Sequence, residues 1–403
     1  MKKRIIPILL PFALVLMFHG CATHSVHEVD TTPINHAQRE IPEDALLDVG
    51  IQVFNAGELS EEDMAKEGTN AQIRKAESHF IPVHLQYTLQ KSSHWGNVQV
   101  IPTEKASVDV MVKGEIIESN GEELVLKVAV MDITGKEWFQ KVYKAEANEF
   151  FYEDMVMGER DAFQDLYNAI ANHMTEYKEG LSDEEIQQIR EISRLKFAAK
   201  IAKNPYEDYL KTNKKGTVTI NRLPADNDPM LERVLKIRER DLMYVDVLNE
   251  YYEKYYARMF PEYEEWRKAD LTERKAIRAI KKDAVVRKVA GILLMAAAVG
   301  LGMGDVSGTG ALQATMAIIG GQVFIEGLNI SRETKIHAAA IQELGESFGS
   351  EMEPITMEFE GKKYELTGSA EEQYEHWQEL LRKIYEAETG FTLDTPSSRI
   401  PDE

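Results

Sequence analysis

The sequence contains very little cysteine and comparatively little positive charge. Cys21 is the single cysteine among 403 residues, and one thiol excludes both an internal disulfide framework and a cysteine-rich metal site. Lysine and arginine total 47 against 68 aspartates and glutamates, which gives a formal net charge of −21 at pH 7. Because affinity for nucleic acid comes from clustered Lys and Arg, we expect no nucleic-acid partner.

Sequence motifs of metal and cofactor chemistry are also missing. The ten histidines contain no H-E-x-x-H string and no paired ligand spacing on a convincing helix. We therefore predict no metal and no cofactor. We expect His84 and His173 to be hydrogen-bonded residues on the helices of a domain.

One catalytic string is present in the second half of the chain. Residues 345–349 match the G-x-S-x-G motif of serine hydrolases, but in that chemistry a strand leads into the turn that carries the serine. Here a helix-like run, residues 335–344, precedes Ser347. We predict no catalytic residue, and the alternative is an envelope hydrolase that uses Ser347 on lipid or cell wall.

The amino terminus has the pattern of a secretory signal. Three of the first four residues are basic and residues 5–18 are uncharged, as in the n-region and h-region of a signal peptide. The uncharged stretch is broken by Pro7 and Pro11, and it is shorter than the ~20 apolar residues that span a bilayer. We predict that residues 1–20 are a signal peptide that is removed.

Phe18-His19-Gly20-Cys21 resembles the lipobox of bacterial prolipoproteins. Gly20 and Cys21 match that pattern, whereas Phe18 and His19 replace its usual aliphatic and small residues. The resemblance implies that Cys21 is acylated, with palmitate among its lipids, and becomes the first residue; two or three acyl chains give a stable anchor. Ala22, not aspartate, would follow, which implies sorting to the periplasmic side of the outer membrane. The alternative is ordinary secretion with a stray cysteine.

Between the lipobox and residue 178 the sequence predicts a tether and a small folded domain. Residues 21–45 are polar without apolar periodicity, so we predict a flexible tether. Residues 46–178 predict a small mixed domain of order β-α-β-β-β-α, because alternating strand patterns flank helical stripes and an Asn-Gly turn signal joins two strands at residues 119–121. The expected strands lie near residues 47–53, 98–101, 108–118, 123–132 and 138–145, and the expected helices at 73–90 and 162–177.

This predicted domain resembles the amino-terminal TolB and curli-secretion lipoprotein type of domain. The resemblance implies a periplasmic protein-binding or ring-forming module without catalysis. The long strand pairs from which the curli protein makes a membrane barrel are not evident, so no channel is implied. The residues that carry the resemblance are Leu47–Phe54, Leu85–Leu89, Trp95–Val100, Val110–Ile116 and Val128–Gly135.

The second half predicts a mainly helical domain, residues 182–390, and a tail, residues 391–403, so the fold class is α+β. Helices are expected at 183–203 and 230–259, with Pro261 ending or bending the second and a further helix beginning near Thr272. A short strand is expected at 217–221. A small β-hairpin is predicted at 355–366, and Ser369 with Glu372 forms a capping box for a last helix.

Residues 289–325 are free of charge except for Asp305 and are rich in Gly and Ala, which predicts an apolar helical hairpin. Burial against other helices is preferred because small residues permit close packing; self-association into a homo-oligomer and contact with a membrane surface are the alternatives. A preceding basic run favours the membrane alternative. Its membrane-contact candidates are Arg274, Lys275, Arg278, Lys281, Lys282, Arg287 and Lys288.

An aromatic run between Tyr251 and Trp266 is interleaved with glutamates. It predicts a packed helix face, and the alternative is stacking on the sugars of peptidoglycan. Together these patterns favour a non-enzymatic, lipid-anchored envelope protein that binds other envelope proteins as a scaffold or accessory factor. The alternatives are the hydrolase and an oligomeric, membrane-apposed protein that uses the 289–325 hairpin.

Overall fold

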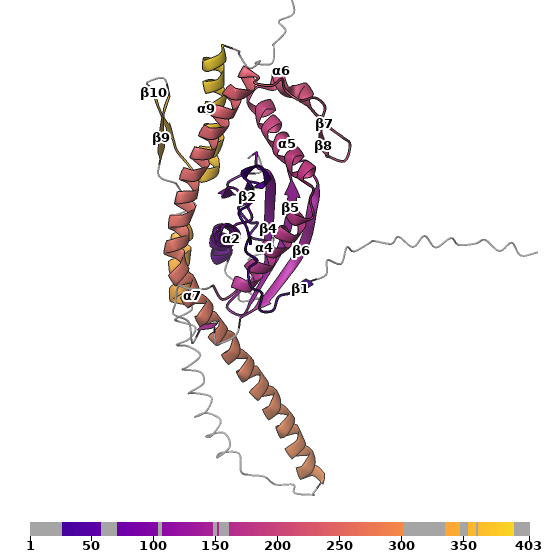
Figure 1. Cartoon of the computed structure of the whole chain (residues 1–403). Helices are drawn as coiled ribbons and strands as arrows, with labels where there is room; N and C mark the ends of the chain where they lie inside the picture. Colours follow the sequence, from indigo (N-terminus) through magenta and orange to yellow (C-terminus); the bar gives the residue numbers. More distant parts are fainter. Residues whose placement is uncertain are drawn as a thin grey trace, which may run out of the picture.

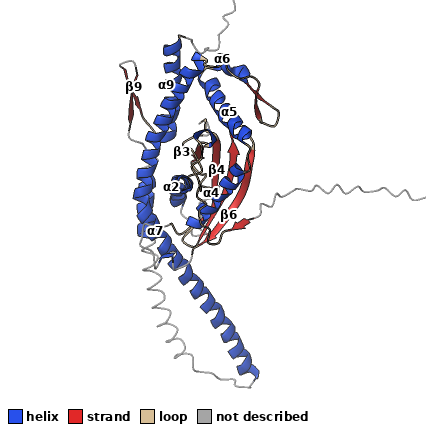
Figure 2. Ribbon diagram, viewed as in Figure 1, coloured by secondary structure: helices blue, strands red, loops and turns tan. Residues whose placement is uncertain are grey.

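The computed structural model shows an α+β fold in which a long helix runs across a helix-covered sheet (Figure 1, Figure 2). The signal peptide, Cys21, Ser347, most of the 289–325 segment and the tail lie outside the described residues. The structure describes residues 26–57, 71–103, 107–147, 151–152, 161–300, 335–346, 354–359 and 362–390.

The sheet has six strands in the order β1-β6-β5-β4-β2-β3. Strand β2 lies parallel between β3 and β4, and β4, β5 and β6 form an antiparallel meander. In β4 and β5 the residues on one face are buried, as the alternating pattern of apolar side chains predicts. The bounds are β1 Val26–Glu28, β2 Val49–Gln52, β3 Val98–Ile101, β4 Val110–Ser119, β5 Glu123–Asp132 and β6 Glu137–Glu146.

Two helices lie between the sheet and the long helix (Figure 1). They are α2, Ala71–Ser92, which connects the parallel strands β2 and β3, and α4, Gln164–Glu179. The predicted strands and helices form where expected, but from β2 to α4 the order is β-α-β-β-β-β-α, with four strands between the two helices where the predicted order has three. His84 and His173, on these two helices, are both hydrogen-bonded, as expected.

Residues 26–45 do not form the free tether that the sequence predicted. Strand β1 pairs in parallel with β6, and the strap, residues 29–45, continues from it and includes the short helix η1, Glu43–Ala45. Asn168 donates to the carbonyl oxygen of Thr32 (2.8 Å), and the side chain of Asn172 bonds both Asn35 N (2.8 Å) and Pro33 O (2.9 Å). Because hydrogen bonds hold the strap, its sequence shows no apolar period.

Helix α7, Pro229–Gly300, is continuous where the sequence predicted two helices. Pro261 removes one backbone donor from its interior, but Met259 and Tyr263 on either side are fully buried. Their packing holds the chain in helical geometry through the proline, and the ribbon curves along its course (Figure 1). Residues 289–300 of the predicted hairpin form the end of this helix.

Of the other elements, α5 and α9 pack on α7, and the β7–β8 hairpin lies beside α5 (Figure 1). The predicted capping box is present, since Ser369 accepts from Glu372 N and Glu372 accepts from Ser369 N. Trp377 stacks on Tyr244 of α7 with ring centroids 4.9 Å apart. The elements are α5 Asp183–Ile201, α6 Lys203–Tyr206, η2 Glu207–Tyr209, β7 Leu210–Thr212, β8 Val218–Ile220, β9 Ile355–Phe359, β10 Lys362–Leu366 and α9 Ala370–Thr389.

The aromatic run of α7 packs inward. Tyr252, Tyr255 and Trp266 are buried, and Tyr256 stacks on Phe80 of α2 with centroids 4.5 Å apart. These rings contribute to the core between α2 and α7, so the prediction of a packed helix face is confirmed. Among the described helices, none is both long enough and apolar enough to cross a membrane.

Candidate functional site: a buried charge network between the long helix and the sheet domain

The predicted membrane-contact residues fall on the lower part of α7. Arg274 Nε lies 2.7 Å from Asp270 Oδ2, and Arg278 pairs with Glu122 in the turn between β4 and β5. Lys282 is exposed. Arg274 and Arg278 are thus bound to carboxylates of this chain. The same helix also contains the other four candidates, Lys275, Lys281, Arg287 and Lys288.

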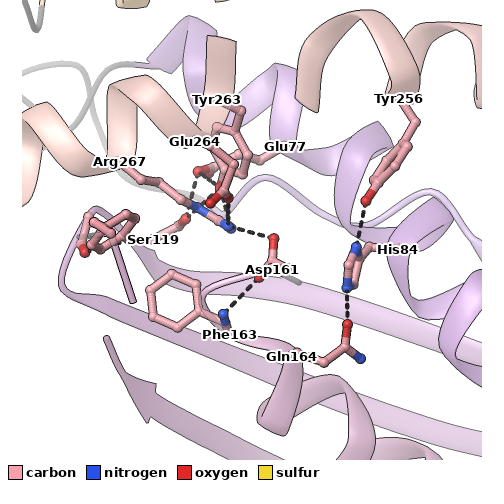
Figure 3. Close-up of polar contacts among 12 residues, drawn as sticks. Glu77, His84, Ser119, Asp161, Phe163, Gln164, Tyr256, Tyr263, Glu264 and Arg267 are labelled. Atoms are coloured by element: carbon pink, nitrogen blue, oxygen red, sulfur yellow. Dashed lines mark hydrogen bonds and ion pairs between the residues drawn. The ribbon is translucent and has the colours of Figure 1, made fainter. Parts of the chain in front are cut away.

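A buried cluster that the sequence did not predict lies just before this basic run (Figure 3). Arg267 of α7 is fully buried, and its Nη1 donates to Asp161 Oδ2 at 2.7 Å and to Glu264 Oε1 at 3.1 Å. Its Nη2 donates to the hydroxyl of Tyr263 at 3.0 Å. The guanidinium also lies over the ring of Phe163, 4.8 Å from its centroid. Both charge and stacking therefore hold Arg267.

The cluster continues into α2 and β4. Glu77 Oε1 accepts from the hydroxyls of Tyr263 and Ser119, each at 2.6 Å, while Glu77 Oε2 lies 3.5 Å from Arg74 Nε. Arg74 Nη1 in turn donates to the carbonyl oxygen of Ile116 at 3.1 Å. Side chains of α2, β4 and α7 therefore share one network, which fixes the long helix on the sheet domain.

The two carboxyl groups beside Arg267, those of Asp161 and Glu264, have pKa values shifted in opposite directions. Burial alone would raise the pKa of Asp161, but the charge of Arg267 and the backbone N–H of Phe163 bring that pKa below its usual value. Burial, and then the charge of Asp161, raise the pKa of Glu264 to about 7. Asp161 is therefore the permanent counter-charge of Arg267, and Glu264 titrates near neutral pH.

His84 lies beside this cluster with both ring nitrogens bonded (Figure 3). Nε2 lies 2.9 Å from Gln164 Oε1, and Nδ1 lies 2.7 Å from the hydroxyl of Tyr256. Because Gln164 Nε2 donates to Thr88 and Asn168, Gln164 Oε1 is the acceptor and His84 Nε2 carries the proton. Burial lowers the pKa of His84, so its imidazole is neutral and serves packing and hydrogen bonding.

This environment predicts a loss of stability in mild acid. His84 has a pKa of about 6.5 in the unfolded chain and a lower pKa in the folded protein. As the pH falls below about 6.5, the unfolded chain therefore binds a proton at His84 more readily than the folded protein does. Burial has the largest effect on the pKa of His84 and lowers it. The charge of Asp161 opposes this effect and raises the pKa, whereas the charge of Arg267 lowers it further. We expect the free energy of unfolding to fall more steeply in the wild type than in His84→Gln, by up to about 1.4 kcal/mol per unit of lowered pKa.

Glu264 and Asp241 act in the opposite direction. Burial raises the pKa of Glu264 to about 7 and that of Asp241 to about 6, so the folded protein gains stability from their protonation as the pH falls. Urea unfolding of wild type and His84→Gln, from about pH 7 to about pH 5, isolates His84 because both proteins keep these two carboxyl groups. A constant difference between the two proteins over that range would contradict a neutral, buried His84.

The described residues contain no group of three or more His, Cys, Asp or Glu side chains placed to hold a metal ion. The segment before Ser347, residues 335–346, is helical, whereas the hydrolase turn requires a strand there. Ser347 itself lies outside the described residues. The cluster around Arg267 thus joins elements through bonds among its own side chains, while Arg267 Nε and Arg74 Nη2 have no hydrogen-bond partner among the described residues.

The fold and this network define an α+β protein whose long helix is fixed by buried ion pairs to a β-α-β-β-β-β-α domain. Comparison of the chain with known protein families, curated proteins and solved structures finds no match.

Proposed function

We propose that this chain is a lipid-anchored envelope protein, without catalytic activity, that binds other envelope proteins as a scaffold or accessory factor on the periplasmic side of the outer membrane. The observation that carries the proposal is the short connection between Cys21 and the folded domain. Strand β1 begins at Val26, and five extended residues span at most about 18 Å. An acylated Cys21 would therefore hold the sheet domain close to the bilayer.

The strap supports the same proposal. It fastens the anchored end of the chain to β6 and α4 through backbone pairing and the side chains of Asn168 and Asn172. A lipid on Cys21 would thus restrain the orientation of the domain as well as its distance from the membrane, which suits a protein that positions partners.

The end of α7, residues 278–300, extends away from the sheet domain and could contact a partner (Figure 1). The pair Arg278–Glu122 joins α7 to the sheet domain, and the helix continues from there to Gly300. At about 1.5 Å per residue this extension measures about 33 Å, and it projects beyond the sheet domain (Figure 1). The TolB and curli-secretion type of domain, which the element order of the sheet domain resembles, also points to protein binding.

A second candidate is an oligomeric, membrane-apposed protein. One observation favours it: the basic run and the uncharged residues 289–300 follow one another on a single continuous helix. In this alternative the extension of α7, and not Cys21, would make the main membrane contact.

Membrane fractionation and intact mass of the full-length protein, compared with Cys21→Ser, test the proposal. We expect the wild type to begin at acylated Cys21 and to sediment with the outer membrane, and Cys21→Ser to keep its signal or be released. Ala22→Asp is the matched control: it should keep the acyl chains but remain in the inner membrane. Cleavage of both wild type and Cys21→Ser at one non-cysteine site, with both proteins soluble, would refute the anchor. Cys21→Ser that has lost its signal peptide but still sediments with membrane would favour the second candidate.

Partner binding is tested separately by photo-crosslinking in cells. Ile117 of β4 and Met243 of α7 are exposed apolar side chains on the two parts of the fold, so each can carry a photoreactive residue without disturbing the core. We expect discrete adducts with envelope proteins that disappear in Cys21→Ser. Adducts that are unchanged in the soluble variant would contradict a scaffold that works at the membrane.

A further inference from the structure

A cavity lies between the strap and the end of α4. Its volume is about 940 Å³, within the range of about 300–1,000 Å³ that small-molecule sites occupy. The strap forms one wall, and residues near the α4–α5 junction form another. The cavity is therefore built from two segments that the hydrogen bonds of Asn168 and Asn172 already hold together.

Two buried polar side chains in the wall have unused hydrogen-bonding atoms. His94 is 6% exposed and Thr175 is 2% exposed, and both line the cavity. Neither His94 Nε2 nor Thr175 Oγ1 has a hydrogen-bond partner among the described residues. A buried polar atom without a partner costs about 1–3 kcal/mol, so a polar group of a ligand at this position would be favourable.

Lys178 supplies a positive charge to the same wall. Its residue is 6% exposed, its Nζ donates to the carbonyl oxygen of His94 at 2.6 Å, and it lies over the ring of Trp95, 5.5 Å from the centroid. That carbonyl is the one acceptor that the described residues offer to Nζ, so the ammonium has further donors for a ligand. Burial lowers the pKa of Lys178 to about 8, which leaves it charged at neutral pH.

The remaining lining is apolar on one side and acidic at two positions. Ile34 and Ile41 of the strap face the cavity together with Leu181 and Ile186. Glu179 and Asp183 also line it, and their charges oppose a ligand of high negative charge. Arg39 of the strap adds a second positive charge to the lining. Two cations and two carboxylates favour a ligand of low charge, and the buried ammonium of Lys178 beside the apolar side chains favours a monoanion that has an apolar part.

We propose that this cavity binds a small organic monocarboxylate, whose carboxylate accepts hydrogen bonds from Lys178 Nζ and Thr175 Oγ1 and whose apolar part lies against Ile34, Ile41, Leu181 and Ile186. The ligand would bridge the strap and α4, so its binding would stabilise the strap on the domain. The assignment is independent of the lipid anchor, because it depends on residues of the folded domain alone.

Titration of the full chain in detergent with sodium hexanoate, followed by calorimetry, tests this site. We expect saturable binding, at least tenfold weaker in Lys178→Met. Lys196→Met is the matched control, because Lys196 is also a partly buried lysine that donates to a backbone carbonyl, that of Ile133 at 2.7 Å, but it lies outside this cavity. Absence of hexanoate binding in the wild type, or equal weakening by both substitutions, would overturn the proposal.

Two measurements keep the proposal testable if Lys178→Met fails to fold. Thr175→Val is nearly isosteric and should weaken hexanoate binding several-fold. In the wild type, affinity should fall above about pH 8 as Lys178 loses its charge, and a flat profile would overturn the assignment. Hexanol and inorganic phosphate separate the two parts of the ligand: each should bind more weakly than hexanoate, and tighter binding of either would refute a monocarboxylate with an apolar part.

Discussion

Replacing Arg267 with methionine is expected to lower the free energy of unfolding by about 3–5 kcal/mol, because it leaves Asp161 as an uncompensated buried charge. Both side chains are fully buried and their ion pair is 2.7 Å long. Methionine keeps most of the aliphatic volume, so the loss reports the charge and its hydrogen bonds. Urea unfolding of the two proteins at neutral pH measures it.

Arg240→Met is the control for this prediction. Arg240 is on the same helix and pairs with Glu388 at 2.9 Å, but the two side chains are 41% and 32% exposed, so its loss should cost about 0–1 kcal/mol. A second variant, Arg267→Met with Asp161→Leu, removes both charges and should recover much of the stability. Similar values for Arg267→Met and Arg240→Met would show that the buried pair does not hold α7.

The position of this cluster explains why sequence patterns missed it. Tyr263, Arg267 and Leu271 follow one another at four-residue intervals and share one face of α7, and all three are buried. That spacing indicates a buried ion pair, because a charged residue between two apolar ones on a packed helix face requires an oppositely charged partner. The partner Asp161 lies far away in the sequence, and only the tertiary structure brings it to Arg267.

The sheet domain was predictable because its signals are local and repeated. Alternation in Leu124–Val130 and the helical stripe of α2 report burial on one face, and both elements form where expected. Pro261 predicts an end or a bend of the helix, and α7 curves but does not end there (Figure 1), because packing of its buried neighbours overrides the loss of one backbone hydrogen bond. The strap was missed for the opposite reason: its attachment is made by Asn168 and Asn172, which give the strap itself no pattern.

Gly121 shows a predicted turn whose glycine has a different role from the expected one. The Asn-Gly signal places the turn between β4 and β5 correctly, but neither Asn120 nor Gly121 has the positive φ of the usual two-residue Asn-Gly turn. Gly121 instead lies against the backbone of α7, and its N–H donates to Asp270 Oδ2 at 2.9 Å. The glycine is therefore required by the approach of the helix.

Gly121→Ala is expected to lower the free energy of unfolding by about 2–3 kcal/mol, at the upper end of overpacking effects. The added Cβ would lie 1.9 Å from the carbonyl oxygen of Arg267 and 2.6 Å from Leu271 N, and backbone atoms can make room only if α7 moves. Urea unfolding measures the loss, and faster amide hydrogen exchange around residues 263–278 should locate it.

Gly216→Ala is the matched control for Gly121→Ala, because it changes the same residue type without a clash. Gly216 has φ of +84° and its added Cβ would meet nothing within 4 Å, so the substitution should cost about 1–2 kcal/mol of backbone strain and leave exchange in α7 unchanged. If Gly121→Ala left exchange in α7 unchanged as well, the turn would not support the helix. Faster exchange in Gly121→Ala alone would mean that the β4–β5 turn holds α7 on the sheet domain by close backbone contact, in addition to the charge pairing that Arg267→Met tests.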